Sequence, residues 1–238
     1  MIRIRELVSK EKLQYQVFAA LSVTVFALTS IAYFLDTLIF QQFLGEINPF
    51  AASFLIILLV FALLSFLLSK GWFAIYKKGN LKGLLYATGL AALFGLIAIL
   101  ADFSLRFYPA DINVLFPKSL LYYPAIGFYA ETVFQVLPLT LLLIALSPVS
   151  KRIGTSRALW IGILVASVLE PVFQVLSLTA GQTPSWFSAF EFVRIFLIIV
   201  SQLSLFKRYD FVTMYWFRIV YYMFWHVGWG YLRLILIF

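Results

Sequence analysis

Hydrophobic positions run in long unbroken stretches along this chain, and polar residues gather in short segments between them. Seven stretches are long enough to cross a bilayer, which takes about 20 apolar residues. They cover residues 16–40, 49–69, 81–103, 119–147, 156–178, 187–206 and 211–236. The pattern predicts an all-α fold, a polytopic transmembrane helix bundle of about seven spans (six to eight), with residues 1–238 forming a single integral membrane domain.

Composition narrows the function classes. Of the 238 residues, 63% are hydrophobic and 12% are charged, and the mean hydropathy is +1.00, so a soluble globular enzyme is excluded. The chain has no cysteine, which excludes disulfides, thiolate metal sites and cysteine nucleophiles. The net charge of +8 comes from lysines and arginines that lie mostly in short loops, where they act as topology signals. We therefore expect no nucleic-acid partner.

The basic residues sort the loops into two groups. The N-terminal segment and the segments 70–82, 148–157 and 207–210 are basic, and they alternate with loops that hold few or balanced charges. The positive-inside rule therefore predicts that the N-terminus is cytoplasmic and the C-terminus external. We expect the membrane to be the cell membrane, that is, the plasma or inner membrane. The charged N-terminal segment precedes the first apolar run without a small-residue cleavage site, so we expect the first span to be retained.

Two of the outer loops differ in character. Residues 104–118 contain two prolines and mixed charge, which predicts an external loop or an interfacial helix able to act as a lid. Residues 179–186 carry no charge and form a short external connection in this topology.

Five ionisable residues lie well inside the predicted spans, where each costs at least about 2.5 to 3.5 kcal/mol unless it has a partner or a function. They are Glu131, Glu170, Arg194, Arg218 and His226. With about 1.5 Å of rise per residue, Glu131, Glu170 and His226 lie roughly 18, 12 and 15 Å below the external surface. These three titratable groups are therefore predicted to share one layer of the membrane.

Helical spacing extends this layer into three polar faces. Residues four apart project from one side of a helix and turn toward the bundle interior when they are polar. The faces consist of the pair Glu131 and Gln135, the pair Glu170 and Gln174, and a stripe of Arg218, Tyr222, His226 and Gly230. We expect the three faces to meet.

An ordinary structural role is the competing interpretation for each of these groups. A buried glutamate beside an arginine is often an inert ion pair, and a single histidine is often bonded to a nearby carbonyl. On this view Arg194 pairs with Glu170 or with Glu191. Asp36 and Asp102 lie near span ends and are interpreted as structural.

Three segments of the chain resemble motifs of the CAAX protease and bacteriocin-processing (CPBP) family of intramembrane proteases. Residues 130–135, AETVFQ, are similar to the Glu-Glu-x-x-x-Arg motif, with Glu131 at the second glutamate. The run that ends at Gln174 is similar to Phe-x-x-x-His, with Glu170 in place of the phenylalanine. The run YYMFWHVGWG is similar to His-x-x-x-Asn, with His226 at the histidine and Gly230 at the asparagine. The resemblance covers roughly residues 119–231 and rests on order, spacing and hydropathy.

The resemblance implies catalytic roles for Glu131, His226, Gln174 and Glu170. In the family a glutamate activates a water molecule, and a histidine and an asparagine stabilise the oxyanion. Glu131 is then the predicted general base, and His226 with the Gln174 amide stabilises the tetrahedral intermediate. No His-Glu-x-x-His motif is present, and the chain has one histidine, so we predict no metal and no cofactor.

Three functions stay open at this point. The first is an intramembrane peptidase-like protein in which a Glu-activated water cleaves a peptide bond near or within the membrane. The second is a catalytically inactive CPBP-like scaffold that binds a partner protein or a lipid. The third is a small proton-coupled transporter, since buried Glu and His can relay protons. The expected partners are membrane lipids and a membrane-inserted or lipidated peptide substrate.

Overall fold

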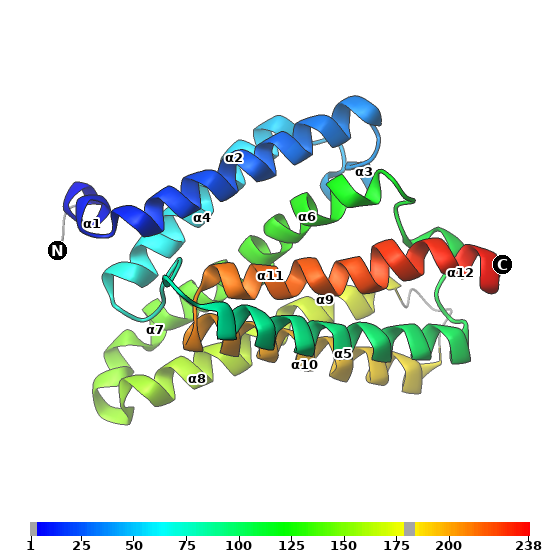
Figure 1. Cartoon of the computed structure of the whole chain (residues 1–238). Coiled ribbons are helices and arrows are strands. Elements are labelled where there is room, and N and C mark those ends of the chain that lie inside the picture. The colour runs from blue at the N-terminus through cyan, green and yellow to red at the C-terminus, as the bar shows by residue number, and fades with distance from the viewer. Residues whose placement is uncertain (1–3, 179–183) are drawn as a thin grey trace.

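The computed structural model describes residues 4–178 and 184–238 and folds them into a bundle of helices (Figure 1). Within these two ranges the chain contains no β-strand, so the predicted all-α fold is confirmed. Part of the predicted external connection at 179–186 lies outside the described residues.

The helices follow the predicted stretches closely. They are α1 (Ile4–Lys10), α2 (Lys12–Leu35), α3 (Gln41–Leu44), α4 (Pro49–Ser69), α5 (Leu81–Leu105), α6 (Ser119–Ala130), α7 (Leu137–Ile153), α8 (Thr155–Ala166), α9 (Leu169–Leu178), α10 (Ser185–Arg208), α11 (Phe211–Tyr222) and α12 (Gly230–Leu236). A π-helical segment, Glu131–Val136, joins α6 to α7, and a second, Met223–Trp229, joins α11 to α12.

The number of spans agrees with the prediction. Six helical segments in the described ranges are long and apolar enough to cross a membrane, and α6–α7 and α8–α9 each count as one of them. The last helical run, 211–236, is not one of these six segments, although its length is comparable. It carries Arg218 and Arg233. The bundle therefore has between six and eight spans.

Two predicted boundaries are wrong. The first span ends at Leu35 and not at residue 40, because Asp36 adopts an extended conformation that stops α2. The fourth span continues to Ile153 instead of ending at 147, since Pro148 is accommodated inside α7 and the helix stops only at Gly154, where φ is 88°. The expected basic loop at 148–157 is thus mostly helical.

Small residues on α5 let the last helical run approach closely. Ala87, Ala91, Gly95 and Ala98 are buried along one side of α5, and α11 lies beside this helix in Figure 1. A Cβ atom added at Gly95 would lie 2.7 Å from the Cβ of Phe224, which is closer than real Cβ contacts allow. Close packing of this kind is what holds helices together in lipid, where burial from water does not contribute.

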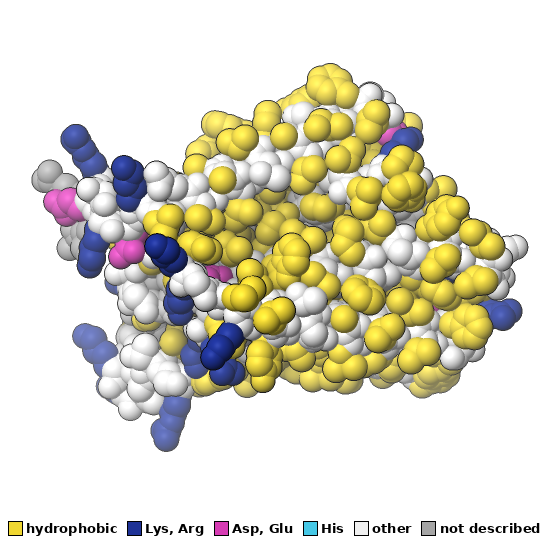
Figure 2. Space-filling model, viewed as in Figure 1, with side chains coloured by type: hydrophobic (Ala, Val, Ile, Leu, Met, Phe, Trp, Pro, Cys, Tyr) yellow, Lys and Arg dark blue, Asp and Glu magenta, His cyan; other side chains and the backbone are white. Residues whose placement is uncertain are grey.

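Most lysines and arginines gather at one end of the bundle (Figure 2). The four basic segments expected on one side of the membrane contribute to this end: α1, the 70–82 loop, the junction of α7 and α8, and the end of α10. The charged side chains thus mark one pole of the molecule. The flanks between the poles are predominantly hydrophobic, as Figure 2 shows for the visible face.

Candidate functional site

Arg218 of α11 is the centre of the polar layer. Its guanidinium group donates to both oxygens of Glu170 on α9, with Nη1 2.7 Å from Oε1 and Nη2 2.8 Å from Oε2. The Nε atom lies 2.8 Å from Oε1 of Glu131. The remaining N–H groups reach the hydroxyl of Tyr222 at 3.2 Å and Oε1 of Gln202 at 3.3 Å. All five donors of the guanidinium group are therefore in use.

Two glutamines complete this network. Gln202 of α10 donates to Oε1 of Glu131 at 2.6 Å and accepts from Gln135 at 2.9 Å. Gln135 lies one turn after Glu131 and also reaches Oε2 of Glu170 at 3.4 Å. The network joins the π-helical segment after α6 to α9, α10 and α11. Gln202 was not a sequence-based candidate, although a glutamine inside the apolar run of α10 was the signal that could have found it.

Glu131 is fully enclosed, with a relative exposure of 0%. One of its oxygens carries both bonds just described, and the other, Oε2, has no hydrogen-bond partner among the described residues. The π-helical turn that begins at Glu131 is a local feature often found at functional sites. Pro138, which lacks an N–H donor, lies two residues after the end of this π-helical segment and suits the break in the α-helical pattern.

His226 lies in the second π-helical segment and is held from two sides. Its ring stacks on that of Tyr123, with 4.4 Å between the centroids, and its Nδ1 is bonded to Oδ1 of Asn113. The hydroxyl of Tyr123 accepts from the N–H of Val114, so it donates its own hydrogen to Oδ1 of Asn113. That oxygen is therefore an acceptor, and the Nδ1 of His226 must carry the proton.

Asn113 comes from the loop between α5 and α6 and fills space left by Gly230. A Cβ atom at Gly230 would lie 3.0 Å from Nδ2 of Asn113. The resemblance to the CPBP family placed an asparagine at position 230, and here an asparagine amide reaches the neighbourhood of His226 from a different part of the chain. No sequence pattern pointed to Asn113, because the contact depends on how the loop folds.

The loop that carries Asn113 is anchored by Arg233 of α12. This buried arginine donates to Asp102 with Nε 2.7 Å from Oδ2, and it also donates to the carbonyl oxygens of Tyr108 at 3.0 Å and Pro109 at 2.7 Å. Trp229 donates to the same carboxylate at 2.6 Å. Asp102 thus has the structural role that the sequence indicated, and it fixes the loop over the site.

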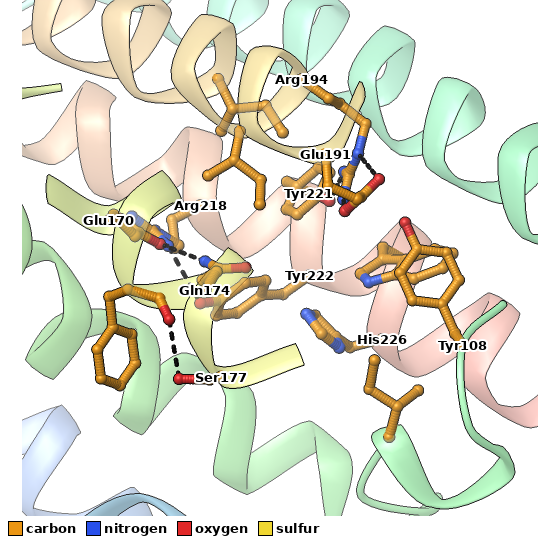
Figure 3. Close-up of a pocket in the computed structure, with 15 residues that line it drawn as sticks. Tyr108, Glu170, Gln174, Ser177, Glu191, Arg194, Arg218, Tyr221, Tyr222 and His226 are labelled. Atoms are coloured by element: carbon orange, nitrogen blue, oxygen red, sulfur yellow. Dashed lines mark hydrogen bonds and ion pairs between the residues drawn. The ribbon is translucent and has the colours of Figure 1, made fainter. Parts of the chain in front are cut away.

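Two adjoining cavities of about 220 and 230 Å³ lie within this layer. Figure 3 shows the first. Both are lined by Gln174, Tyr222 and His226 together with Glu170, Phe173 and Ile112. The first continues toward α10, and the second lies between α6 and α9. Phe173 lines both cavities and is itself 49% exposed.

Arg194 of α10 lines the first cavity and is paired within its own helix. It donates to the carboxylate of Glu191 through Nε at 2.9 Å and through Nη2, and to the hydroxyl of Tyr221 at 2.6 Å. Of the two pairings expected for Arg194, the structure has the one with Glu191.

The structure brings together three of the four predicted catalytic residues. Glu170, Gln174 and His226 line both cavities, whereas Glu131 lines neither and lies behind Arg218. The Gln174 amide donates to Oε1 of Glu170 at 3.0 Å. The described residues include no group of three or more His, Cys, Asp or Glu side chains that could hold a metal ion.

Comparison of the chain with protein-family models, with curated proteins and with solved structures yields no match. The resemblance to the CPBP family therefore stays a prediction from the sequence. The function has to be argued from the site itself.

Proposed function

We propose that this multi-pass membrane protein binds an amphipathic, membrane-inserted ligand in its intramembrane polar cavity and does not hydrolyse it. One observation carries the proposal. Glu131, the predicted general base, is enclosed behind Arg218 and bonded to it and to Gln202, while Gln174 and His226 face the cavity. A general base must reach the proton that it abstracts directly or through one water molecule, and Glu131 lines no cavity in which substrate could sit.

The position of the cavity supports a ligand that arrives from the lipid. The second cavity is bounded by α6 on one side and α9 on the other, and exposed apolar side chains such as Phe173 and Phe43 form part of its lining. A ligand with an apolar chain can lie between these helices while its polar group reaches His226. Cavities with apolar walls and a few converging polar groups are the usual form of small-molecule sites.

The orientation of the protein in the membrane is part of the same proposal. With the basic pole in the cytoplasm, as the positive-inside rule requires, the cavity lies in the outer half of a cell membrane. The loop that carries Asn113 then covers it from outside.

Asn113 favours a second candidate function, the peptidase. Its side-chain amide lies beside Gly230 and next to His226. An amide is therefore present near position 230, where the CPBP resemblance predicts an asparagine. The Nδ2 of Asn113 has no partner among the described residues and is a donor of the kind that stabilises an oxyanion. Activity of this type requires Arg218 to release Glu131 when substrate enters.

One probe tests both functions. A lipidated peptide with a photoreactive diazirine beside its lipid is added to the purified protein in lipid nanodiscs. Crosslinked residues are mapped by mass spectrometry, and cleavage products are sought in the same samples. We expect crosslinks on α6 and α9 that unlabelled peptide displaces, and no cleavage. Peptide cleaved by the wild type but not by Glu131→Gln would establish the peptidase instead, and a lack of displaceable crosslinks would refute ligand binding.

A matched variant separates the cavity from the rest of the bundle. Ser177→Ala changes a residue that lines the first cavity, but its hydroxyl is already bonded to the carbonyl oxygen of Phe173. Crosslinking is expected to persist in Ser177→Ala and to weaken in His226→Phe.

A further inference from the structure

Glu131 differs from its neighbour Glu170 in how its two carboxyl oxygens are used. Oε1 of Glu170 accepts from Arg218 and Gln174. Oε2 of Glu170 accepts from Arg218 and Gln135. In Glu131, Oε1 takes both hydrogen bonds, and the enclosed Oε2 takes none from the described residues. The first pattern is that of an ionised carboxylate, and the second suits a neutral acid, whose carbonyl oxygen accepts while its hydroxyl oxygen carries the hydrogen.

The remaining buried carboxyl groups in the described part of the chain resemble Glu170. Both oxygens accept hydrogen bonds in Glu191, Asp102 and Asp210. Glu131 is therefore the exception among the buried carboxyl groups of these residues, and its position inside the bundle gives Oε2 no contact with solvent.

The direction of the hydrogen bonds at Oε1 of Glu131 is fixed by Arg218. An arginine cannot accept a hydrogen bond, so the atom of Gln202 that it contacts is the amide oxygen. The amide nitrogen of Gln202 then donates to Oε1 of Glu131, which also accepts from Nε of Arg218. Oε1 thus receives two N–H groups and carries no hydrogen itself. A proton on this carboxyl group must lie on Oε2.

Gln135 offers an acceptor for that proton. Its Nε2 donates to the amide oxygen of Gln202, so the opposite end of its amide is the oxygen, and this Oε1 has no partner among the described residues. Gln135 and Glu131 lie four residues apart in one π-helical segment. The network therefore contains two unpartnered acceptors, and a hydrogen on Oε2 of Glu131 is a donor that it lacks.

The charges of the cluster favour the same proton. Arg218 pairs with both Glu131 and Glu170, so two ionised carboxylates would leave one net negative charge. The neighbouring pair of Arg194 and Glu191 is balanced and does not compensate it. An enclosed carboxylate without full compensation is costly, and such a group takes up a proton instead.

The helices around Glu131 bring no second cation into contact with it among the described residues. Neither α4 nor α6 contains Asp, Glu, Lys or Arg. On the other surrounding helices the charged residues are Lys151 and Arg152 in the last turn of α7, Glu170 on α9, Glu191, Arg194, Lys207 and Arg208 on α10, and Arg218 on α11. The tyrosines of α6 and α11 add no charge near pH 7.

We infer that Glu131 is a proton-binding site: near pH 7 it is a neutral carboxylic acid whose hydroxyl group, on Oε2, donates toward Oε1 of Gln135. The cluster around Arg218 is then electrically neutral. A neutral acid has no proton affinity to offer as a general base, so this inference assigns a different role to the predicted catalytic residue that lines neither cavity. It does not depend on whether the cavities bind a ligand.

Infrared spectroscopy tests the inference on the unaltered protein. The protein is measured at pH 7 in dodecyl maltoside micelles, because this detergent has no ester carbonyl group to mask the C=O stretching band of a neutral carboxylic acid. We expect this band in the wild type. Its absence would overturn the inference, since Glu131 would then be ionised, with a water molecule as the donor to the two unpartnered acceptors.

Variants assign the band to one residue. Glu131→Gln should abolish it, and Glu46→Gln, which replaces an exposed glutamate, should leave it unchanged. A band that survives in Glu131→Gln would place the proton on another carboxyl group and would refute the assignment. The wild-type spectrum needs no variant, so a folding defect in Glu131→Gln leaves the first test intact.

The stability of Glu131→Gln is a second measurement of the same proton. A glutamine keeps the carbonyl acceptor at Oε1 and places an N–H donor where the inferred O–H lies. The melting temperature in micelles should therefore stay within about 4 °C of the wild type, which corresponds to about 1 kcal/mol for a chain of this size. A larger fall would show that Arg218 needs a negative charge at this position, and the inference would be wrong.

Discussion

Arg218 holds Glu170 in a two-pronged ion pair, with both carboxylate oxygens within 2.8 Å of the guanidinium group. The same arginine reaches Glu131, so that one cation ties α9 and the π-helical segment after α6 to α11. A buried arrangement of this kind contributes little net stability by itself, but the loss of one partner leaves uncompensated charges in a medium of low polarity. The integrity of this part of the bundle therefore depends on Arg218.

Replacement of Arg218 by methionine is expected to destabilise the protein by about 3 to 5 kcal/mol, because Glu131 and Glu170 would then be buried without a cation. The measurement is thermal or denaturant unfolding in detergent micelles, followed by tryptophan fluorescence. The triple variant Arg218→Met, Glu131→Gln, Glu170→Gln should recover part of this loss, since no charge remains.

Arg157→Met is the control, because Arg157 is exposed at the start of α8. It should leave unfolding nearly unchanged. An Arg218→Met protein as stable as the wild type would show that the carboxylates do not need the arginine.

The sequence predicted the spans and the polar faces, because both depend on patterns within one helix. The meeting of Glu131 and Glu170 also follows from the rule that polar residues turn inward. That both carboxylates share Arg218 as a partner does not follow from this rule. Arg218 was expected in the same stripe as His226, yet it faces the two carboxylates, while His226 faces Asn113. The choice of partner depends on helix rotation and on the π-helical segments, and neither can be read from the spacing of residues.

Asn113 shows a second limit of the sequence. The 104–118 segment was predicted as a loop with a possible function as a lid, and the structure has it as a loop with one short 3₁₀ turn, Ala110–Ile112. Its contact with His226 depends on the anchoring of the loop by Arg233 and Asp102. Such long-range hydrogen bonds leave no periodic trace in the sequence.

The ion pair between Lys118 and Asp36, outside the spans, predicts a pH dependence. The hydrogen bond from Lys118 lowers the pKa of the Asp36 carboxyl group. Because the pKa is lower in the folded state, the pair stabilises the protein above the unfolded pKa of about 3.9, and this contribution disappears as the pH falls through the folded value. Lys118→Met should therefore be less stable than the wild type at pH 7, by less than about 1 kcal/mol because the pair is partly exposed.

The difference between wild type and Lys118→Met should shrink as the pH falls below the unfolded pKa of about 3.9, and it should vanish once Asp36 is protonated in both states. Melting temperatures at a series of pH values are the measurement. Lys82→Met, at an exposed position, provides the comparison. A difference that is constant with pH would assign the effect of Lys118 to packing.

The absence of cysteine makes the orientation easy to test. Single cysteines are introduced at Lys78, in the basic 70–82 loop, and at Leu115, in the opposite loop, which are both exposed. A membrane-impermeant maleimide added to intact cells should label Leu115→Cys and leave Lys78→Cys unlabelled until the membrane is permeabilised. Labelling of Lys78→Cys alone would reverse the orientation and place the cavity in the cytoplasmic half of the membrane.

Two glycines of α5 separate helix packing from helix propensity. Gly95 lies against Phe224, and an alanine Cβ there would come within 2.7 Å of it, whereas a Cβ at Gly89 meets no atom within 4 Å. Gly95→Ala should therefore cost about 1 to 3 kcal/mol through overpacking, since the Cβ of Phe224 can move only with its backbone. Gly89→Ala should be neutral or stabilise by up to about 1 kcal/mol, because alanine loses less backbone entropy in a helix. Unfolding of the two variants under identical conditions checks this. If both substitutions have the same effect, the helix that carries His226 does not pack against Gly95 in the membrane, and the walls of the cavity would have to be placed differently.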